Sequence, residues 1–390
     1  MNGLALSPLV AAAQAIAVKV AGPASGAVDR ESRFPQEAVD ALKEARLLSA
    51  FVPRDLGGAG CGMTELAQIC ETLGQHCSAT AMVFAMHQIQ VACLVRHASS
   101  SPFFSAYLKA LAQNQNLIAS VTSEVGIGGE MRSSKCAVVL KADRFELQKD
   151  ASTISYGAHA DDLLVTARRN PEAPANDQAL ILVKKGDFTL ECRGAWDTLG
   201  MRGTCSPPFL MQSSGAAEQI MADSFGDIAS QTMVPFSHIL WANCWFGIAT
   251  AALSKARAFV RSQARAKPGV TPPSAMRLAD AFSQLQRLRA NVHDVANECQ
   301  SLMSRPDSGV DVLSSIPFAL KMNNLKLAAS EAVADITQRC LIICGIMGYK
   351  NDSKYAIGQH LRDGLSAALM VSNDRICATN GTMLLVLKDD

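Results

Sequence analysis

The sequence carries little charge, has no paired-cysteine motif and contains no uninterrupted apolar run long enough to cross a membrane. Only 18% of its 390 residues are charged, and 36 lysines and arginines almost balance 35 aspartates and glutamates. This balance gives no electrostatic reason to expect a nucleic acid or an anionic membrane as a partner. The apolar segment 4–21 lacks a basic start and is interrupted by Lys19. It therefore predicts a first amphipathic helix, not a signal peptide or a membrane span.

The twelve cysteines include no CxxC pair and no cluster with histidine at the spacing of metal ligands. Scattered thiols of this kind are typical of small buried side chains in a reducing compartment. We therefore expect a cytoplasmic protein without a metal site. Hydrophobic residues make up 49% of the chain, which fits a large buried interior or a subunit interface. A chain of this length predicts two or three domains.

The period of the apolar residues changes twice along the chain. Apolar residues recur at helical spacing in the first part, for example in 37–50, and again in 278–295 of the last part. Between these parts lie short β-rich runs separated by turn-forming segments: LIASVT, AVVLKA, FELQK, LLVTARR, ALILVKK and FTLEC. Such runs predict an antiparallel barrel or sandwich. The expected domains are an N-terminal α-helical domain at 1–116, a middle β-barrel domain at 117–230 and a C-terminal helical bundle at 231–390.

The most informative stretch is 196–206, which reads WDTLGMRGTCS. Gly200 and Gly203 bracket Met201 and Arg202, and glycine at such positions permits a positive φ or a close approach of the backbone to another group. The stretch resembles, almost letter for letter, the middle-domain signature of the acyl-CoA dehydrogenase family of flavoproteins. The segment FVPRDLGGAG at 51–60 also resembles the first domain of that family.

This resemblance implies an α+β multidomain fold: N-terminal helices, a small antiparallel β-barrel and a C-terminal four-helix bundle. The period of the sequence indicates the same order independently. The resemblance also implies FAD, which the family binds without a Rossmann fingerprint, through barrel loops, the bundle and usually a neighbouring subunit. We therefore expect a homodimer or homotetramer, and the apolar residues at 383–387 fit a buried tail.

A first segment that resembles a flavin-binding motif is Ser123–Glu130, SEVGIGGE, a degenerate form of the family's TEPxAGSD loop. The resemblance places Thr122 and Ser123 among the flavin contacts, and Gly128 keeps the glycine that permits close approach. Gly129 stands where the family has a serine that often contacts the acyl thioester. The alternative interpretation is a flexible glycine-rich turn.

A second segment, Thr153–Gly157, aligns with the family's WITNG strand and turn. Ser155 falls where a hydroxyl commonly donates to the N5 region of the flavin. Thr153 replaces the tryptophan that normally shields the ring, so a large aromatic contact is lost. Both residues are expected to bind the cofactor.

A third segment, Cys344–Tyr349, resembles the family's GGxGY turn, and the pair Arg362–Asp363 resembles the RD pair of the next helix. Gly345 keeps the first glycine of the turn and is expected to contact the cofactor. The second glycine of the motif is Ile346 in this chain.

Four further polar residues are candidates for cofactor contacts. Asn373 and Arg375 follow the RD helix in the segment that the family uses beside its flavin. The family's RxxFG motif, which reaches the cofactor phosphates of a neighbouring subunit, has no clean counterpart. Arg261 and Arg265 lie close to its register. Either could meet a pyrophosphate, and either could be a solvated helix residue.

The catalytic carboxylate of the family is missing from both positions where its members have one. These enzymes remove an α-proton with a carboxylate while a β-hydride passes to flavin N5, so the base must lie within hydrogen-bond reach of that proton. Most members carry this glutamate in an EGTxxI segment after the RD helix, where the present chain has Val371. A branch of the family carries it on the first bundle helix, where the present chain has Ser237.

His238 is the titratable group best placed to substitute for the missing base. It occupies the position of the family's arginine near the substrate carbonyl, and imidazole exchanges protons near neutral pH. The alternative is a helix histidine bonded to a neighbouring loop. Asp374 is the alternative carboxylate, although on a turn it would cap the next helix. His87 and His360 are further candidates that we interpret as structural, and Ser237 is expected to contact the substrate.

Three functions remain open from the sequence. The first is an FAD-dependent oxidoreductase that desaturates an acyl thioester, on CoA or on a carrier protein, with a base other than glutamate. It would pass its electrons to an electron-transfer partner. The second is a flavin-dependent monooxygenase of the same fold, which uses reduced flavin and oxygen and needs no α-proton base. The third is a degenerate flavin-binding subunit without catalysis. We favour a flavin oxidoreductase, because the cofactor segments persist while the base is lost.

Overall fold

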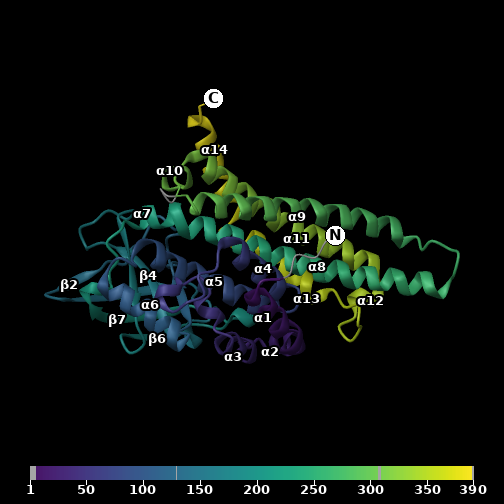
Figure 1. Cartoon of the computed structure of the whole chain (residues 1–390), viewed down its shortest axis with the longest axis horizontal. Helices are drawn as coiled ribbons and strands as arrows, with labels where there is room; N and C mark the ends of the chain where they lie inside the picture. Colours follow the sequence, from purple (N-terminus) through teal and green to yellow (C-terminus); the bar gives the residue numbers. More distant parts are fainter. Residues whose placement is uncertain (1–5, 129, 306–308, 389–390) are drawn as a thin grey trace.

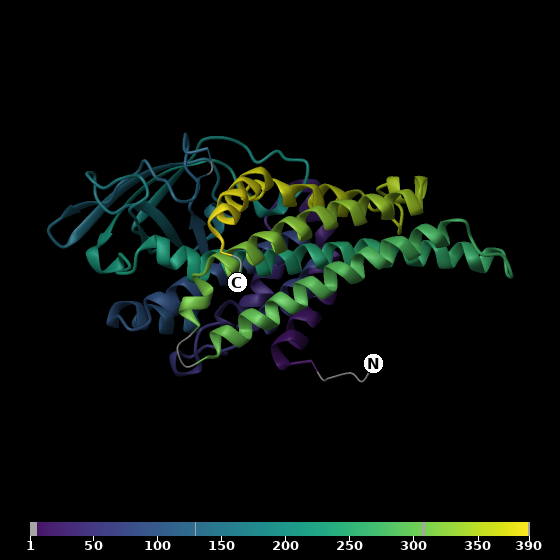
Figure 2. The same ribbon diagram turned by 90° about the horizontal axis from the view of Figure 1, so that it is seen from above.

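The chain folds into two helical parts with strands between them. The computed structural model describes residues 6–128, 130–305 and 309–388. The strands gather at one end of the molecule, and the long helices of the last part run from them to the other end (Figures 1 and 2). The expected order of a helical N-terminal part, strands and a helical C-terminal part is thus confirmed.

The N-terminal part contains six α-helices among the described residues: α1 (Pro8–Ile16), α2 (Gly22–Glu31), α3 (Gln36–Glu44), α4 (Met63–Gly74), α5 (Ser78–His97) and α6 (Pro102–Asn114). Two described stretches, Pro8–Glu31 and α5, are long and apolar enough to cross a membrane by length and composition alone. α5 is buried within the fold, where a helix that is apolar on most sides belongs. α1 is amphipathic, as expected, because Val10, Ala13 and Ile16 are buried on one face and packed towards α4.

The strands form two separate sheets. One has the order β1–β4–β5 and the other the order β2–β3–β7–β6. Their bounds are β1 (Ile118–Val121), β2 (Val139–Lys141), β3 (Arg144–Ala151), β4 (Asp162–Arg168), β5 (Gln178–Val183), β6 (Phe188–Cys192) and β7 (Phe209–Ala216). β5 is buried at every residue, whereas β3 alternates between exposed and buried residues, so only one face of the second sheet packs on the core.

The closed antiparallel barrel expected from the sequence is not confirmed. No sheet of the described residues closes on itself, and β1 pairs with β4 in parallel, with Ile118 opposite Asp162. The chain between these two strands builds the β2–β3 hairpin of the other sheet before it returns, so β4 runs in the same direction as β1. Each of the six expected β-rich runs overlaps one of β1 to β6, and β7 was not expected.

The C-terminal part is built on three long helices, α8 (Val234–Ala266), α9 (Ser274–Met303) and α11 (Ile316–Cys344). Shorter helices complete it: α7 (Phe225–Ile228), α10 (Val310–Leu313), α12 (Ile346–Tyr349), α13 (Gly358–Leu365) and α14 (Asn373–Val386). α8 packs against α9 and α11 and also against α4 of the N-terminal part. α13 and α14 both pack against α11, and α14 rises away from the long helices towards the C-terminal end of the described chain (Figure 1).

The expected domain limits can be located on these elements. The limit at 116/117 falls in the short link between α6 and β1. The limit at 230/231 falls inside a π-helical turn, Ala229–Met233, that joins α7 to α8 without an intervening loop. Because α8 also packs on α4 and α5, the last part shares its core with the first.

Candidate active site

A cavity of about 710 Å³ lies where the three parts of the chain meet. Its walls come from α5, the loop after β1, the segments 153–155 and 196–206, the start of α8 and the segment 362–375. Six methionines line it: Met82, Met86, Met131, Met201, Met233 and Met370. Methionine side chains are flexible and apolar, so most of the lining suits an apolar, adaptable contact surface.

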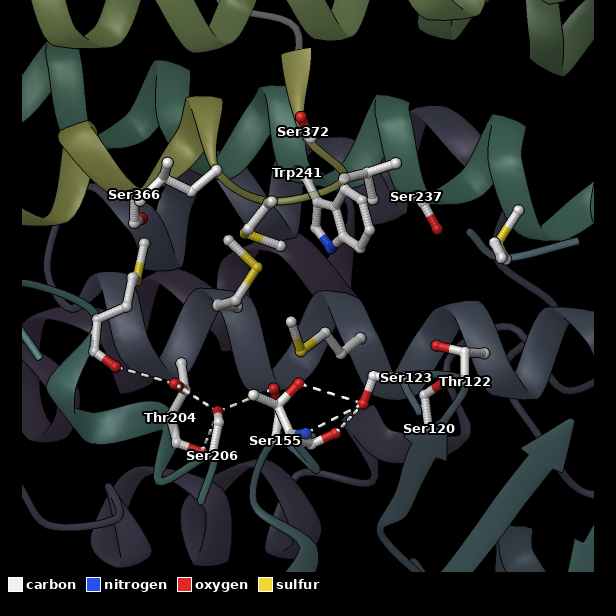
Figure 3. A pocket seen from close by; sticks show the side chains of 18 of the residues that line it. Ser120, Thr122, Ser123, Ser155, Thr204, Ser206, Ser237, Trp241, Ser366 and Ser372 are labelled. Carbon is white, nitrogen blue, oxygen red and sulfur yellow. Dashed lines mark hydrogen bonds between the residues drawn. The ribbon is translucent and has the colours of Figure 1, made fainter. Parts of the chain in front are cut away.

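One wall of the cavity carries a row of hydroxyl groups from separate segments (Figure 3): Ser120, Thr122, Ser123, Ser155, Thr204 and Ser206. The Ser123 hydroxyl accepts from the Thr153 backbone N–H at 3.1 Å and donates to the Thr153 carbonyl at 2.5 Å. The hydroxyl proton of Ser123 is therefore used within the protein. Through these bonds, Ser123 joins two of the three segments that resemble flavin-binding motifs.

Ser155 differs from Ser123 in its hydrogen bonds. Its Oγ accepts a hydrogen bond from Ser206 at 2.9 Å, while Thr204 donates to the Met201 carbonyl at 2.9 Å. No described residue accepts the Ser155 hydroxyl proton, so Ser155 can donate to a ligand in the cavity.

The opposite wall is the first turns of α8, which present Ser237, His238 and Trp241 (Figure 3 labels the first and the last). Trp241 follows Ser237 by four residues and His238 by three, and these are the spacings that put side chains on the same side of a helix. Nδ1 of His238 lies 3.0 Å from the Met322 carbonyl. Since a carbonyl can only accept, Nδ1 carries the proton, and Nε2 is left with its lone pair.

His238 is neutral at ordinary pH. Burial lowers the pKa of its imidazole to about 4. The hydrogen bond to Met322 opposes this shift, and the nearby cation of Lys326 adds to it. The imidazole of His238 is therefore uncharged, with its single proton on Nδ1.

The described residues that line the cavity include no aspartate and no glutamate. Val371, at the position of the family's usual glutamate, lines the cavity with a left-handed φ of 49°. Asp374 is exposed in the first turn of α14 and does not line the cavity. Apart from two arginines, His238 is the only titratable side chain on this lining.

The two arginines, Arg362 and Arg375, both bond to protein groups. Arg362 makes a bidentate ion pair with Asp29, with Nη1 2.9 Å from Oδ1, and also donates to the Leu199 carbonyl at 2.9 Å. Arg375 donates to the Gly128 carbonyl and so ties the start of α14 to the loop after β1.

The segment 196–206 is packed against the RD pair. A Cβ on Gly200 would lie 2.1 Å from the Arg362 carbonyl oxygen, and the Met201 backbone N–H donates to Asp363 at 2.7 Å. The left-handed φ values fall on Met201 and Cys205 instead of the glycines. Of the two roles considered for Gly200 and Gly203, the structure therefore supports close approach.

The structure brings eight of the expected site residues to the cavity: Thr122, Ser123, Gly128, Thr153, Ser155, Ser237, His238 and Arg375. Gly345, Asn373 and Asp374 do not line it, and Gly129 lies outside the described residues. Asn373 instead accepts from the buried Lys326 ammonium at 2.6 Å and holds the start of α14 against α11.

The other histidines considered from the sequence lie away from the cavity lining. His87 uses both ring nitrogens inside the fold: Nε2 donates to the Leu48 carbonyl at 2.7 Å, and Nδ1 accepts from the Ile118 N–H at 3.0 Å. This pairing supports a structural role for His87. Burial lowers the pKa of His360 to about 3, and its Nε2 has no partner among the described residues.

Sequence reasoning missed the residues that give the cavity its polarity away from the hydroxyl row. Trp241 could have been found, because it lies one helical turn after Ser237. Gln90 lies in the apolar helix α5, where no motif marks it.

Arg261, a candidate from the sequence for a pyrophosphate contact, lines a separate cavity of about 470 Å³ near the α8–α9 turn.

Comparison with known proteins gives consistent results. The family model "Acyl-CoA dehydrogenase, N-terminal domain" matches residues 7–115. Cyclohex-1-ene-1-carbonyl-CoA dehydrogenase from Syntrophus aciditrophicus (strain SB) is 22% identical over 367 residues, which cover 93% of this chain and 85% of that protein.

Two solved structures show the same fold. Butyryl-CoA dehydrogenase from Megasphaera elsdenii has a TM-score of 0.82 at 18% identity, covering 99% of this chain and 100% of the other. FMN-bound TdsC from Paenibacillus sp. A11-2, a dibenzothiophene monooxygenase, has a TM-score of 0.82 at 19% identity, covering 97% of both chains. At these identities the likeness concerns the fold alone, and the two proteins differ in reaction.

Proposed function

We propose that this chain, which belongs to the acyl-CoA dehydrogenase family, is a flavin-dependent oxidoreductase that dehydrogenates an acyl thioester carried on CoA or on a carrier protein. The observation that carries the proposal is the arrangement of the two cavity walls. A wall of hydroxyls that can hold a flavin ring faces a helix that presents His238, whose Nε2 can accept a proton.

The residues present fit a flavin ring. Ser155 offers a donor that no described residue uses, and Thr122, Thr153 and Gly128 lie on the same wall. A bound flavin supplies the two-electron acceptor for a hydride from the substrate. We propose FAD, with the segments at 122–128 and 153–155 against its ring.

The remaining cofactor residues are proposed to act across a subunit interface. Gly345 lies outside the cavity, and Arg261 lines a separate one. We propose that these two residues contact the cofactor of a second copy of the chain. Exposed apolar side chains gather on the C-terminal part, including Ile346 (70%), Leu369 (80%) and Leu385 (87%). Surfaces of this kind are typical of protein interfaces. We propose a homodimer or homotetramer, and a monomer by light scattering at micromolar concentration would contradict it.

His238 and Ser237 are proposed to act on the substrate. With Nδ1–H held by Met322, Nε2 of His238 accepts the α-proton, and Ser237 contacts the thioester group beside it. A base with a pKa near 4 has a smaller driving force for proton transfer than one tuned near 7. The low pKa has one benefit, because it keeps Nε2 unprotonated throughout the physiological range.

A second function, flavin-dependent monooxygenation, is favoured by one observation. The described lining has no carboxylate, and a reaction of reduced flavin with oxygen requires no α-proton base. The apolar, methionine-lined walls would also limit water near the reacting centre. This second function uses the same cavity and the same cofactor as the first. It differs in the oxidant of the substrate, which is oxygen in place of the oxidised flavin.

Mixing the purified protein with acyl thioesters in the absence of oxygen separates the two functions. Loss of the flavin's visible absorption on addition of a thioester supports dehydrogenation. Flavin that no thioester reduces, but that after chemical reduction consumes oxygen in a substrate-dependent way, supports monooxygenation. A colourless protein that takes up no added FAD would contradict both and favour a degenerate subunit.

A further inference from the structure

Two buried side chains that line the cavity each have one polar atom without a hydrogen-bond partner in the protein. The indole N–H of Trp241, on α8, is a donor, and Oε1 of Gln90, on α5, is an acceptor. Trp241 is 9% exposed and Gln90 is 3% exposed. Figure 3 shows the indole nitrogen of Trp241 directed into the space between α8 and the hydroxyl row.

These two atoms are distinguished from other unpartnered atoms by their position. Nine buried side-chain polar atoms of the described residues lack a hydrogen-bond partner, and only the atoms of Trp241 and Gln90 belong to residues that line the cavity. Buried polar groups are nearly always hydrogen-bonded, because a buried group without a partner loses the bond it makes with water. A donor and an acceptor left open on neighbouring helices therefore indicate a ligand that completes both.

The chemical role of each atom is fixed. An indole nitrogen can only donate. In Gln90, Nε2 donates to the Met86 carbonyl at 3.3 Å. Since a carbonyl oxygen cannot bond to the amide oxygen of Gln90, the amide is oriented with Oε1 as its open atom.

The charge of the ligand group follows from the rest of the lining. A cationic group would meet no carboxylate there, since no described lining residue is acidic. An anionic group would have to compete for one of two arginines that already bond to protein groups: Arg362 with Asp29, and Arg375 with the Gly128 carbonyl. Burial of an unpaired charge is far more costly than burial of a neutral polar group, so the group that meets Trp241 and Gln90 is neutral.

We propose that the acyl part of the substrate carries a neutral polar group, a hydroxyl or a primary carboxamide, that accepts a hydrogen bond from Trp241 and donates one to Gln90. This inference rests on the proposed function, since it names the acyl class of the same thioester. It excludes a plain hydrocarbon chain as the preferred acyl group, because such a chain would leave both atoms unpaired in the complex.

The experiment compares two pantetheine thioesters of the same shape on the flavin-bound protein by isothermal titration calorimetry. Succinamoyl pantetheine ends in a carboxamide, and 4-methylpentanoyl pantetheine has an isopropyl group in its place. Both carry hydrogens on the α- and β-carbons, as the proposed dehydrogenation requires. Pantetheine is common to CoA and to carrier proteins, so the comparison does not depend on the carrier. A site built to hydrogen-bond a polar group discriminates strongly against the analogue that lacks it. We expect the carboxamide to bind at least about tenfold more tightly.

Variants assign this preference to the two side chains. Trp241→Phe removes the N–H and keeps an aromatic ring, and Gln90→Met removes the acceptor at similar length. Each should reduce the affinity ratio towards one. Trp245→Phe is the matched control, because Trp245 lies one turn further along α8, also has an unpartnered indole N–H, and does not line the cavity. It should leave the ratio unchanged.

Several results would overturn the inference: equal or tighter binding of the 4-methylpentanoyl thioester, no binding of either thioester, a ratio that survives both cavity variants, or a ratio lost equally in Trp245→Phe. Anaerobic flavin reduction is recorded separately. If the preference holds but no thioester reduces the flavin, dehydrogenation fails and the inference stands. If hydrocarbon thioesters reduce the flavin and bind equally well, dehydrogenation stands and the inference fails.

Discussion

The backbone N–H of Met201 donates to Oδ1 of Asp363 at 2.7 Å. This bond joins the stretch 196–206 to the helix that carries the RD pair, 162 residues further along the chain. The other carboxylate oxygen of Asp363 accepts from Ser78, at the start of α5. One buried carboxylate thus connects the N-terminal helices, the strand region and the C-terminal helices beside the cavity.

Asp363 should make stability depend on pH in an unusual direction. Burial raises the pKa of this carboxyl to about 6, from an ordinary value near 3.8. The folded state therefore holds the proton more tightly than the unfolded state. The protonated Asp363 carboxyl therefore adds to the free energy of unfolding at acid pH, and this contribution is lost as the pH rises from about 4 to about 6. A shift of this size corresponds to about 3 kcal/mol.

The variant Asp363→Asn tests this dependence, because it keeps an acceptor for the Met201 N–H and does not titrate. The free energy of unfolding of both proteins is measured in urea at several pH values from 4 to 7. As the pH rises, the value for the wild type should fall relative to that of the variant. A constant difference would contradict the raised pKa. Asp363→Ala removes the acceptor altogether and should destabilise the protein by about 1–3 kcal/mol at any pH.

Gly200→Ala should destabilise the protein and loosen the cavity wall. The added Cβ would lie 2.1 Å from the Arg362 carbonyl oxygen, so the backbone of one segment must move. Overpacking of this kind typically costs about 1–3 kcal/mol. Gly381→Ala is the control, since a Cβ there meets nothing within 4 Å and lies in a helix. It should leave stability unchanged or raise it slightly, and similar losses for both variants would show that close approach is not the reason for Gly200.

Ser155→Ala should weaken flavin binding about fivefold, since a hydrogen bond of this kind is typically worth about 1 kcal/mol. The reason is the hydroxyl proton of Ser155, which no described residue accepts. Ser152→Ala is the matched control, because Ser152 is exposed nearby and does not line the cavity. Fluorescence of the flavin during titration of the apoprotein gives the dissociation constant, and unchanged affinity in Ser155→Ala would remove Ser155 from the cofactor site.

His238→Ala should abolish turnover and leave the flavin bound. A general base typically contributes on the order of 10²–10⁴-fold to the rate. Asp374→Asn is expected to keep wild-type activity, because Asp374 is exposed and outside the cavity lining. A loss below about tenfold in His238→Ala would favour the alternative of a structural helix histidine, and loss of activity in Asp374→Asn alone would move the base to that loop.

The pH profile of the reaction gives an independent check on His238. The unperturbed imidazole pKa is about 6.5, but burial lowers the pKa of His238 to about 4. The active, neutral form therefore persists as the pH falls below 6.5, and the acidic limb of kcat/KM should lie near 4. A limb near 6.5 that disappears in His238→Gln would show that His238 is far less buried during the reaction.

The sequence predicted the order of the parts well because their periods differ strongly. The long helix at 274–303 and six of the seven strands among the described residues coincide with apolar runs of the right period. β7 was missed because it follows Pro207 and Pro208 and contains the polar run Gln212–Ser214. The parallel pairing of β1 with β4 depends on the path of the chain between them, and no local pattern encodes that path.

For the site, motif resemblance found the segments that surround the cavity, since eight of the expected residues line it. It could not find Gln90, which lines the cavity with an amide oxygen that has no hydrogen-bond partner in the protein. It also assigned Ser123 to the flavin, although the hydroxyl proton of Ser123 is used by the Thr153 carbonyl. Hydrogen-bond satisfaction is a property of the folded arrangement, so it could be judged only there.

Anaerobic mixing of the flavin-bound protein with acyl thioesters tests the central claim most directly. We expect a thioester with a neutral polar acyl group to abolish the visible absorption of the flavin in the wild type. The variant His238→Ala should retain the flavin, and the thioester should not bleach it. Flavin that stays oxidised with every thioester, in a protein that consumes oxygen once its flavin is reduced chemically, would contradict dehydrogenation.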